Sequence, residues 1–210
     1  MALVVGLAGG IGCGKSAVAD LLVARGAELI DADVVAREVV APGGPAYGPL
    51  VDRFGRGILA ADGTVDRPAL AAVAFADDRA LADLNGITHP AIGAAMLARR
   101  EALAATDKVV VVAIPLLRAE HRESMGLDVV VVVDCPVDVA LQRLVEQRGM
   151  PREDAQARIA AQMARDDRRT LADYVLDNGG SLDQLPGEVD RLWAWLQDKR
   201  AARTDRGSPA

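Results

Sequence analysis

Cysteine, aromatic residues and long apolar segments are all scarce in this chain of 210 residues. Two cysteines are too few for the disulfide framework of a small secreted domain. No apolar run approaches the roughly 18 residues that span a bilayer, and no signal-peptide pattern opens the sequence. Aromatics make up only 3% of the residues, so the core must be built mainly from aliphatic side chains. These absences predict a reduced, cytoplasmic protein with no membrane partner.

Basic residues are also in the minority, with 24 against 30 acidic ones and a formal charge of -6. A general nucleic-acid binder needs a basic footprint, so this balance argues against nucleic acid as a partner. It remains compatible with a local basic pocket for a small anion. At 51% hydrophobic and 26% charged residues, the composition is typical of a globular domain that buries its own core.

Short apolar runs alternate with segments of helical spacing along the chain. Near-continuous β-branched runs are typical of strands that are covered on both faces. The runs that predict strands are residues 3–7, 28–30, 109–114, 129–133 and 174–176. Because helical stretches separate them, the alternation predicts an α/β fold with a doubly wound, five-stranded parallel sheet and right-handed crossovers.

Two stretches without strand patterns interrupt this alternation. The first is predicted to form several helices that cover a substrate, broken at residues 42–45, at 62–63 and at His89-Pro90. The second is rich in arginine and is predicted to form a lid. We therefore expect a single domain over residues 1–200, followed by a disordered tail over 200–210. Its parts are a core of residues 1–32, 106–147 and 170–198, a helical insertion at 33–105 and a lid at 148–169.

Residues 9–16, Gly-Gly-Ile-Gly-Cys-Gly-Lys-Ser, match the pattern G-x-x-x-x-G-K-S/T between a predicted strand and a predicted helix. Glycines let successive N–H groups turn toward phosphate oxygens, and the helix N-terminus adds partial positive charge. Lys15 is expected to reach the β- and γ-phosphates, and the Ser16 hydroxyl to coordinate Mg²⁺. The segment, called the phosphate loop below, predicts ATP binding by Gly10, Ile11, Gly12, Cys13, Gly14, Lys15, Ser16 and Ala17.

Cys13 lies in this loop at a helix N-terminus, a position that favours the thiolate. It either makes nucleotide binding sensitive to oxidation or is a small side chain at an unconstrained position. Replacement by serine is expected to leave activity intact in either case.

Asp31 and Asp33 follow the second predicted strand, and the carboxyl ends of parallel strands face the ligand crevice. An aspartate there either caps the next helix or accepts a hydroxyl proton as a general base. Beside a phosphate loop, we favour the base for Asp33.

Other candidates come from the second half of the chain. Arginines stabilise transferring phosphoryl groups, and of Arg143, Arg148, Arg152, Arg158 and Arg165 we select the first two. Most of the set is expected to lie on solvated faces, paired with Glu146, Glu153 or Asp154. Asn178 either contacts the adenine edge or belongs to an ordinary turn. His89 either contacts a substrate or packs at a helix break.

These residues together resemble the dephospho-coenzyme A kinase family, from Val5 to about Leu196. The resemblance rests on an ordered set of segments and not on the phosphate loop alone. They are Gly6–Ser16, Asp31–Arg37, Phe54-Gly55, Asp62-Gly63 with Asp66-Arg67, Leu84-Asn85 with His89-Pro90, Pro115–Leu117, Gln142–Leu144, Arg158–Gln162 and Asp177-Asn178.

The resemblance implies a three-layer α/β/α P-loop NTPase fold and Mg²⁺- and ATP-dependent phosphorylation of the ribose 3′-hydroxyl of dephospho-coenzyme A. It implies that Asp33 is the base, that Lys15 and Arg143 stabilise the transferring group, and that Arg148 belongs to the lid. ATP would be held by the phosphate loop with Arg148 and Asn178. Acceptor contacts would come from Asp31, Asp33, Arg37, His89, Pro115, Leu116 and Leu117.

The chain departs from the family pattern at Ala8, Ala17, Ala113 and Arg118-Ala119, where the family favours threonines, an aspartate and an aromatic-acidic pair. The phosphate loop and Asp33 are intact, so we expect activity to persist. The alternatives are another small-molecule or nucleotide kinase of the same fold and a catalytically degenerate coenzyme A-binding protein. A GTP-driven switch is disfavoured because no Asn-Lys-x-Asp motif is present. The sequence does not specify an oligomeric state.

Overall fold

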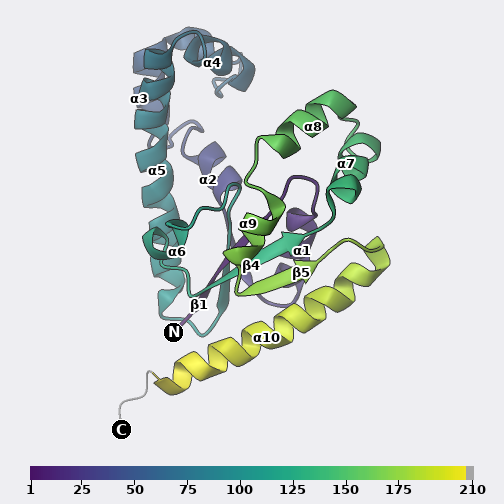
Figure 1. The fold of residues 1–210 in the computed structure, drawn as a ribbon. Coiled ribbons are helices and arrows are strands. Elements are labelled where there is room, and N and C mark those ends of the chain that lie inside the picture. The colour runs from purple at the N-terminus through teal and green to yellow at the C-terminus, as the bar shows by residue number, and fades with distance from the viewer. Residues whose placement is uncertain (207–210) are drawn as a thin grey trace. The chain divides into compact units, whose positions relative to one another are not determined.

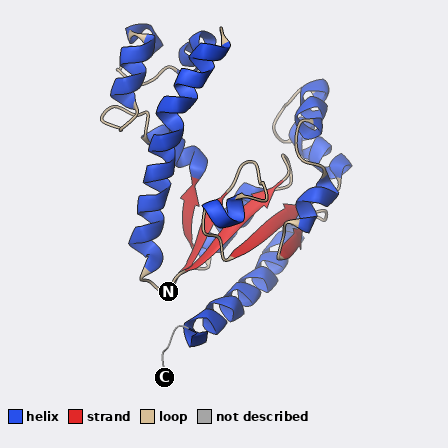
Figure 2. Ribbon diagram, turned by 60° about the vertical axis from the view of Figure 1, so that its left-hand side comes forward, coloured by secondary structure: helices blue, strands red, loops and turns tan. Residues whose placement is uncertain are grey.

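The structure, a computed structural model, describes residues 1–206, apart from the side chains of Leu182 and of residues 204–206. Helices and strands alternate along the chain (Figures 1 and 2). The chain divides into two compact units. One contains Met1–Ile30 and the chain from Leu103 onward, and the other contains Asp31–Ala102.

The first unit is built on a five-stranded sheet with the order β2-β3-β1-β4-β5. β1 pairs in parallel with both β3 and β4, and β4 pairs in parallel with β5. The strands are β1 (Leu3–Gly9), β2 (Glu28–Asp31), β3 (Val109–Ala113), β4 (Val129–Asp134) and β5 (Tyr174–Asp177). Each of the five predicted strands is present within a few residues of its expected bounds, so the predicted five-stranded parallel sheet is confirmed.

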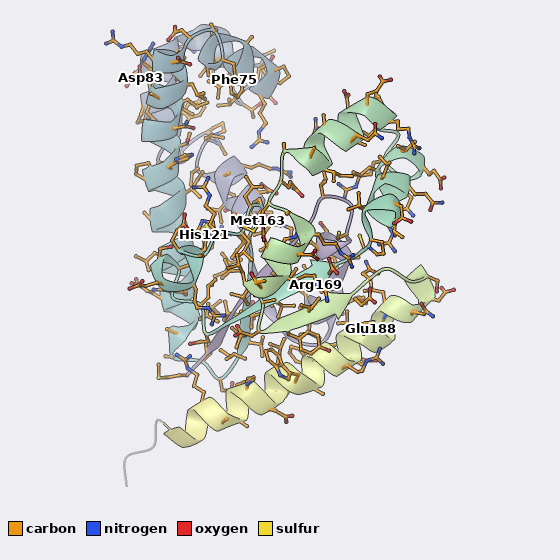
Figure 3. All side chains as sticks on the ribbon, in the orientation of Figure 1. Phe75, Asp83, His121, Met163, Arg169 and Glu188 are labelled. Carbon is orange, nitrogen blue, oxygen red and sulfur yellow. The ribbon has the colours of Figure 1, made fainter. Side chains whose placement is uncertain are left out.

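Helices cover both faces of this sheet. On one face, α1 (Lys15–Ala24) and α10 (Leu185–Arg206) pack against the strands, and Val131 and Val133 of β4 belong to that core. Alternate side chains of a strand point to opposite faces, so Asp134 points to the other side. There it binds two arginines of α9 (Arg165–Thr170), which lies over β4 (Figures 1 and 3). The predicted three-layer arrangement is therefore confirmed.

The remaining helices of this unit connect the strands. α6 (His121–Ser124) follows β3, and α7 (Val137–Glu146) and α8 (Arg152–Ala160) follow β4. Pro151 is the N-cap of α8, a position where the missing N–H of proline removes no helical hydrogen bond. The side-chain oxygen of Gln184 accepts the N–H of Ser181 at 3.2 Å at the 3₁₀ turn η2 (Leu182–Gln184), which precedes α10.

The expected disorder from residue 200 is wrong for residues 200–206, because α10 continues to Arg206. Side-chain contacts hold this part of the helix. Arg200 donates to the carbonyl of Asp107 at 2.6 Å, and Arg203 forms an ion pair with Asp128. Residues 207–210 lie outside the described part of the chain.

The second unit is helical, as expected, and has a core of its own. It contains α2 (Ala32–Glu38), α3 (Tyr47–Phe54), the 3₁₀ turn η1 (Arg56–Ile58), α4 (Arg67–Ala74) and most of α5 (Asp78–Ala104). Its buried core residues are Val35, Val39, Ala46, Leu50, Ile58 and Leu70. Arg53 of α3 and Asp83 of α5 form a salt bridge at 2.6 Å (Figure 3).

The predicted helix break at His89-Pro90 is wrong, because α5 runs through Pro90 without interruption. A proline inside a helix costs about 3 kcal/mol, since it removes a hydrogen bond and crowds the preceding turn. Apolar side chains on both sides of Pro90 offset this cost. Leu84, Ile87, Ile92 and Met96 of α5 pack against the core of the second unit.

None of the helices among residues 1–206 combines the length and apolar character that a membrane span requires.

Candidate active site

The phosphate loop turns between β1 and α1 because two of its glycines adopt left-handed backbone conformations. Gly12 has φ +80° and Gly14 has φ +90°, values that residues with a side chain adopt only with strain. A Cβ on Gly12 would also lie 2.7 Å from the carbonyl oxygen of Ala140. Gly14 is the N-cap of α1 and has no side chain to occupy the helix's first N–H groups. A helix N-terminus without a side-chain cap is a typical binding position for an anionic ligand.

Asn178 supports the loop from behind. Its side chain is 3% exposed, and its amide donates to the carbonyl oxygen of Cys13 at 2.8 Å. Its own N–H donates to the carbonyl oxygen of Asp134 at 2.7 Å. The structure thus shows the Asn178 amide bracing the phosphate loop, and its predicted contact with adenine stays a prediction.

Arg143 of α7 binds the turn that follows β5. Its Nη1 donates to the carbonyl oxygen of Asn178 at 2.8 Å and its Nη2 to that of Gly180 at 3.0 Å. The guanidinium thus ties α7 to the residue that braces the phosphate loop. The expected stabilisation of a transferring phosphoryl group by Arg143 stays a prediction, and in this structure its terminal nitrogens hold the turn.

The start of α1 presents three of the predicted ligand contacts. Lys15 is half-buried, whereas Ser16 and Ala17 are exposed. Arg148 is exposed in the segment between α7 and α8. These placements are compatible with the predicted nucleotide contacts and do not test them.

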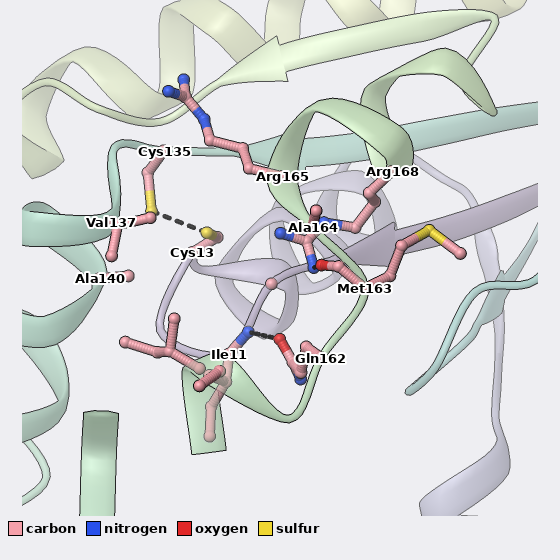
Figure 4. Close-up of a pocket in the computed structure, with 13 residues that line it drawn as sticks. Ile11, Cys13, Cys135, Val137, Ala140, Gln162, Met163, Ala164, Arg165 and Arg168 are labelled. Atoms are coloured by element: carbon pink, nitrogen blue, oxygen red, sulfur yellow. Dashed lines mark hydrogen bonds between the residues drawn. The ribbon is translucent and has the colours of Figure 1, made fainter. Parts of the chain in front are cut away.

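A cavity of about 260 Å³ adjoins the phosphate loop (Figure 4). It is lined by Gly10, Ile11 and Cys13 of the loop, by Cys135 and the start of α7, and by residues 159–160, 162–165 and Arg168. Gln162 reaches across it, and its Oε1 accepts the N–H of Ile11 at 2.9 Å. A side-chain oxygen therefore occupies one of the loop's backbone donors.

Arg168 of α9 lies against the same loop. A Cβ on Gly10 would meet Arg168 Nη2 at 2.9 Å, so a larger residue there would displace the guanidinium from its present position. The Nε of Arg168 is buried and has no hydrogen-bond partner among the described residues. Neither Gln162 nor Arg168 was assigned a role from the sequence. The signals were present, because Gln162 ends the segment Arg158–Gln162 and Arg168 belongs to the arginine-rich stretch.

Asp134 at the end of β4 anchors α9. Its side chain is 1% exposed and accepts Arg165 Nε at 2.9 Å, Arg165 Nη2 at 2.7 Å and Arg169 Nη1 at 2.5 Å. Burial alone would raise the pKa of Asp134, but the hydrogen bonds and charges of the two arginines outweigh it and hold the pKa below its usual value. Arg165 is therefore an exception to the expectation that most of these arginines pair with surface carboxylates, because its partner Asp134 is buried.

Asp31 and Asp33 have different roles in the second unit. Asp31 is the N-cap of α2, and its carboxylate accepts the N–H of Asp33 at 2.7 Å and that of Val34 at 3.3 Å. Asp33 is the second residue of the helix and is exposed. Because Asp31 caps the helix, the capping alternative for Asp33 is excluded and its carboxylate remains available for proton transfer.

The predicted acceptor residues lie in both units. Pro115, Leu116 and Leu117 follow β3 and line a second cavity of about 190 Å³, together with Gly9, residues 161–163, Arg118 and Arg168. Arg37 is exposed in the last turn of α2, and His89 is exposed on α5. The structure thus brings the Pro115–Leu117 segment to the start of the phosphate loop, and the substrate contacts of all five residues stay predictions.

The chain combines a parallel sheet, a phosphate loop after the first strand, and helices that place arginines beside this loop. Together these features define a P-loop kinase fold. The chain belongs to the dephospho-CoA kinase family, whose model matches residues 3–184. It is 50% identical to a dephospho-CoA kinase of Streptomyces avermitilis, over 92% of this chain and 94% of that protein.

Solved structures agree in fold. A Thermus thermophilus protein, TT1252, has a TM-score of 0.75 at 29% identity, covering 94% of this chain and 97% of its own. A dephospho-CoA kinase from Campylobacter jejuni has a TM-score of 0.68 at 23% identity, covering 93% of this chain and 97% of its own.

Proposed function

We propose that this protein transfers the γ-phosphoryl group of ATP to the ribose 3′-hydroxyl of dephospho-coenzyme A, giving coenzyme A and ADP. The observation that carries the proposal is an intact phosphate loop in a chain half identical to a dephospho-CoA kinase over nearly its full length. The geometry of the site supports a role for each of several residues.

ATP is held through its phosphates. The N–H groups of the phosphate loop and of the first turn of α1 donate to the β- and γ-phosphate oxygens, and Lys15 adds a positive charge there. Gln162 Oε1, which accepts the Ile11 N–H at 2.9 Å, leaves this donor when a phosphate oxygen takes its place. Gln162 thereby couples occupation of the loop to the position of the segment between α8 and α9.

The exposed Ser16 hydroxyl, in the first turn of α1, fits one ligand position of Mg²⁺. Hard divalent cations prefer oxygen, and Mg²⁺ usually takes few protein ligands because it retains water. A bound Mg²⁺ would neutralise charge on the phosphate oxygens.

Asp33 acts as the general base. Its carboxylate takes the proton of the 3′-hydroxyl while that oxygen forms a bond to the γ-phosphorus, and the bond to the bridging oxygen of ADP breaks. The carboxylate can do this because Asp31 supplies the helix cap and Asp33 is exposed.

Arg168 stabilises the charge that develops on the transferring group. The two cavities beside the phosphate loop share three lining residues, Gln162, Met163 and Arg168, and only Arg168 carries a charge. A group that passes from a nucleotide in one cavity to an acceptor in the other would pass this guanidinium. Its buried and unpartnered Nε is a donor that an anionic oxygen satisfies.

The test is an ATP-consumption assay in which dephospho-coenzyme A, pantetheine and nucleoside monophosphates are offered separately. We expect ADP formation only with dephospho-coenzyme A, with a 3′-phosphate in the product by phosphorus NMR. Turnover with another acceptor would show a different kinase of this fold. Tight binding of dephospho-coenzyme A without ADP formation would show a degenerate binding protein.

A further inference from the structure

The two cysteines of the chain meet beside the phosphate loop. They are separated by 122 residues in the sequence, yet Cys135 Sγ lies 2.7 Å from Cys13 Sγ (Figure 4). Cys13 is in the loop, and Cys135 lies between β4 and α7. Both side chains are buried, at 3% and 2% exposed. Cys13 is therefore tightly packed, and the description of it as a small side chain at an unconstrained position is wrong.

The pair is polarised toward a thiolate on Cys13. The Cys135 thiol donates to Cys13 Sγ, and this hydrogen bond lowers the pKa of Cys13 to about 7 against the opposing effect of burial. Arg168 adds to the shift, and its guanidinium and Cys13 Sγ both pack against Gly10. The pKa of Cys135 is raised, first by the same hydrogen bond and then by burial. Cys13 is thus the nucleophile and Cys135 the resolving thiol.

A small reagent can reach the pair from solvent. Both cysteines line the cavity of about 260 Å³ next to the phosphate loop, together with Arg165 and Arg168. A hydroperoxide is small enough to enter such a cavity, and a neighbouring cation favours the thiolate that attacks it.

We propose that Cys13 and Cys135 form an oxidisable dithiol, a modification site at which a hydroperoxide creates a disulfide between the phosphate loop and the β4–α7 junction and so lowers kinase activity. The formation of the disulfide stands on the geometry of the pair alone. Its effect on activity rests on the proposed function.

The chemistry balances with the hydroperoxide as the oxidant. The Cys13 thiolate attacks one peroxide oxygen, the O–O bond breaks, and the leaving oxygen takes a proton to give water or an alcohol. Cys135 sulfur then attacks the sulfur of the Cys13 sulfenic acid, the S–O bond breaks, and hydroxide leaves with the Cys135 proton as water. In total the two thiols lose two protons and two electrons, and the two electrons reduce the O–O bond of the peroxide.

The disulfide changes the phosphate loop at its centre. A disulfide bond is about 2.05 Å long, so the two sulfurs must approach each other from their present 2.7 Å. Cys13 cannot move independently, because its N–H donates to Gly10 at 3.1 Å and its carbonyl oxygen accepts the Asn178 amide. A displacement of about 1 Å in catalytic geometry can cost roughly a hundredfold in rate, so the smaller approach of about 0.65 Å that the disulfide requires should cost at least about tenfold.

The experiment treats the reduced full-length protein with hydrogen peroxide and counts thiols after unfolding. We expect two thiols before treatment and none after it, a monomer on a non-reducing gel, and a peptide in which Cys13 is joined to Cys135. In Cys135→Ser, a 1,3-diketone probe should label Cys13 as a sulfenic acid. In Cys13→Ser, the remaining Cys135 thiol should react at least about tenfold more slowly than Cys13 does in Cys135→Ser, because burial raises the pKa of Cys135 and keeps it protonated.

Activity is measured on the same samples, each relative to its own untreated protein. The kinase activity of wild type should fall at least about tenfold on treatment and recover with a dithiol reductant. For Cys13→Ser, the ratio of treated to untreated activity should stay near one. Thermal melts of the treated wild type serve as the control that the protein is still folded. Two retained thiols, or only intermolecular disulfides, would overturn the proposal, and so would a complete internal disulfide with unchanged activity. If reduced wild type has no kinase activity, the proposed function fails while the thiol count still decides whether the dithiol exists.

Discussion

Replacing Asp134 by asparagine removes the buried charge that holds α9 against the sheet. The carboxylate is 1% exposed and accepts hydrogen bonds from both Arg165 and Arg169. The amide has nearly the same shape, but it carries no charge and turns a donor toward one of the guanidinium groups. The substitution therefore tests the anchor without creating a cavity.

The size of the effect follows from the number and the exposure of the partners. A hydrogen bond to a charged group contributes about 1.5–3 kcal/mol, and breaking a fully buried ion pair costs about 3–5 kcal/mol. The side chains of Arg165 and Arg169 are 37% and 43% exposed, so water can solvate them once the carboxylate is gone. We therefore expect Asp134→Asn to lower the free energy of unfolding by about 2–3 kcal/mol, or roughly 4–12 °C in Tm.

The assay compares the chemical and thermal unfolding of Asp134→Asn with that of a control, Asp167→Asn. The control changes an exposed aspartate of α9, the helix that Asp134 anchors. The control should stay within about 0.5 kcal/mol of wild type, as is usual for surface substitutions. A double-mutant cycle with Arg165→Met should give a coupling energy of about 1 kcal/mol or more. A loss for Asp134→Asn no larger than for the control, or a coupling near zero, would refute the anchor.

The other predictions concern catalysis, nucleotide binding and pH. Asp33→Asn should lower kcat by about 10²–10⁴, the usual contribution of a general base. The control Asp78→Asn removes an exposed first-turn charge from α5 and should leave kcat unchanged, and equal kcat values for Asp33→Asn and wild type would exclude Asp33 as the base. Gln162→Glu should raise the KM for ATP by about tenfold, because a carboxylate binds the Ile11 N–H more strongly than the amide oxygen does and repels phosphate. An unchanged KM in initial-rate titrations would show that the Ile11 N–H does not bind the nucleotide. The pKa of Asp134 is lowered by folding, so its contribution to stability is complete above its pKa in the unfolded chain and is lost as pH falls through its folded value; unfolding measured against pH should show a shallower acid limb for Asp134→Asn than for wild type.

Local patterns were sufficient for the strands and for the phosphate loop. β3 and β4 are valine runs buried at each position, and such runs have no other stable place than a covered sheet. Gly12 and Gly14 adopt positive φ angles, which produce the turn that the glycine-rich motif predicted. Both features depend on residues that are neighbours in the sequence, so they can be predicted from the sequence alone.

Where a long-range contact outweighs a local preference, the sequence was misleading. Pro90 predicts a break, but apolar contacts along α5 keep the helix continuous. The polar end of the chain predicts disorder, but ion pairs and hydrogen bonds to distant residues keep α10 helical to Arg206. The partner of each side chain comes from a remote segment, and no local pattern records it.

By itself, the sequence determined the parallel sheet, the helical second unit, the phosphate loop and the family resemblance, because each depends on spacing, propensity or motif. Only the tertiary structure decided how the side chains are used. It gave the helix cap to Asp31 and so left Asp33 available, and it directed the Asn178 amide to the loop. It also brought together the two cysteines, which neither composition nor spacing could join. Such pairings follow from the packing of segments more than a hundred residues apart, and packing is a property of the folded chain.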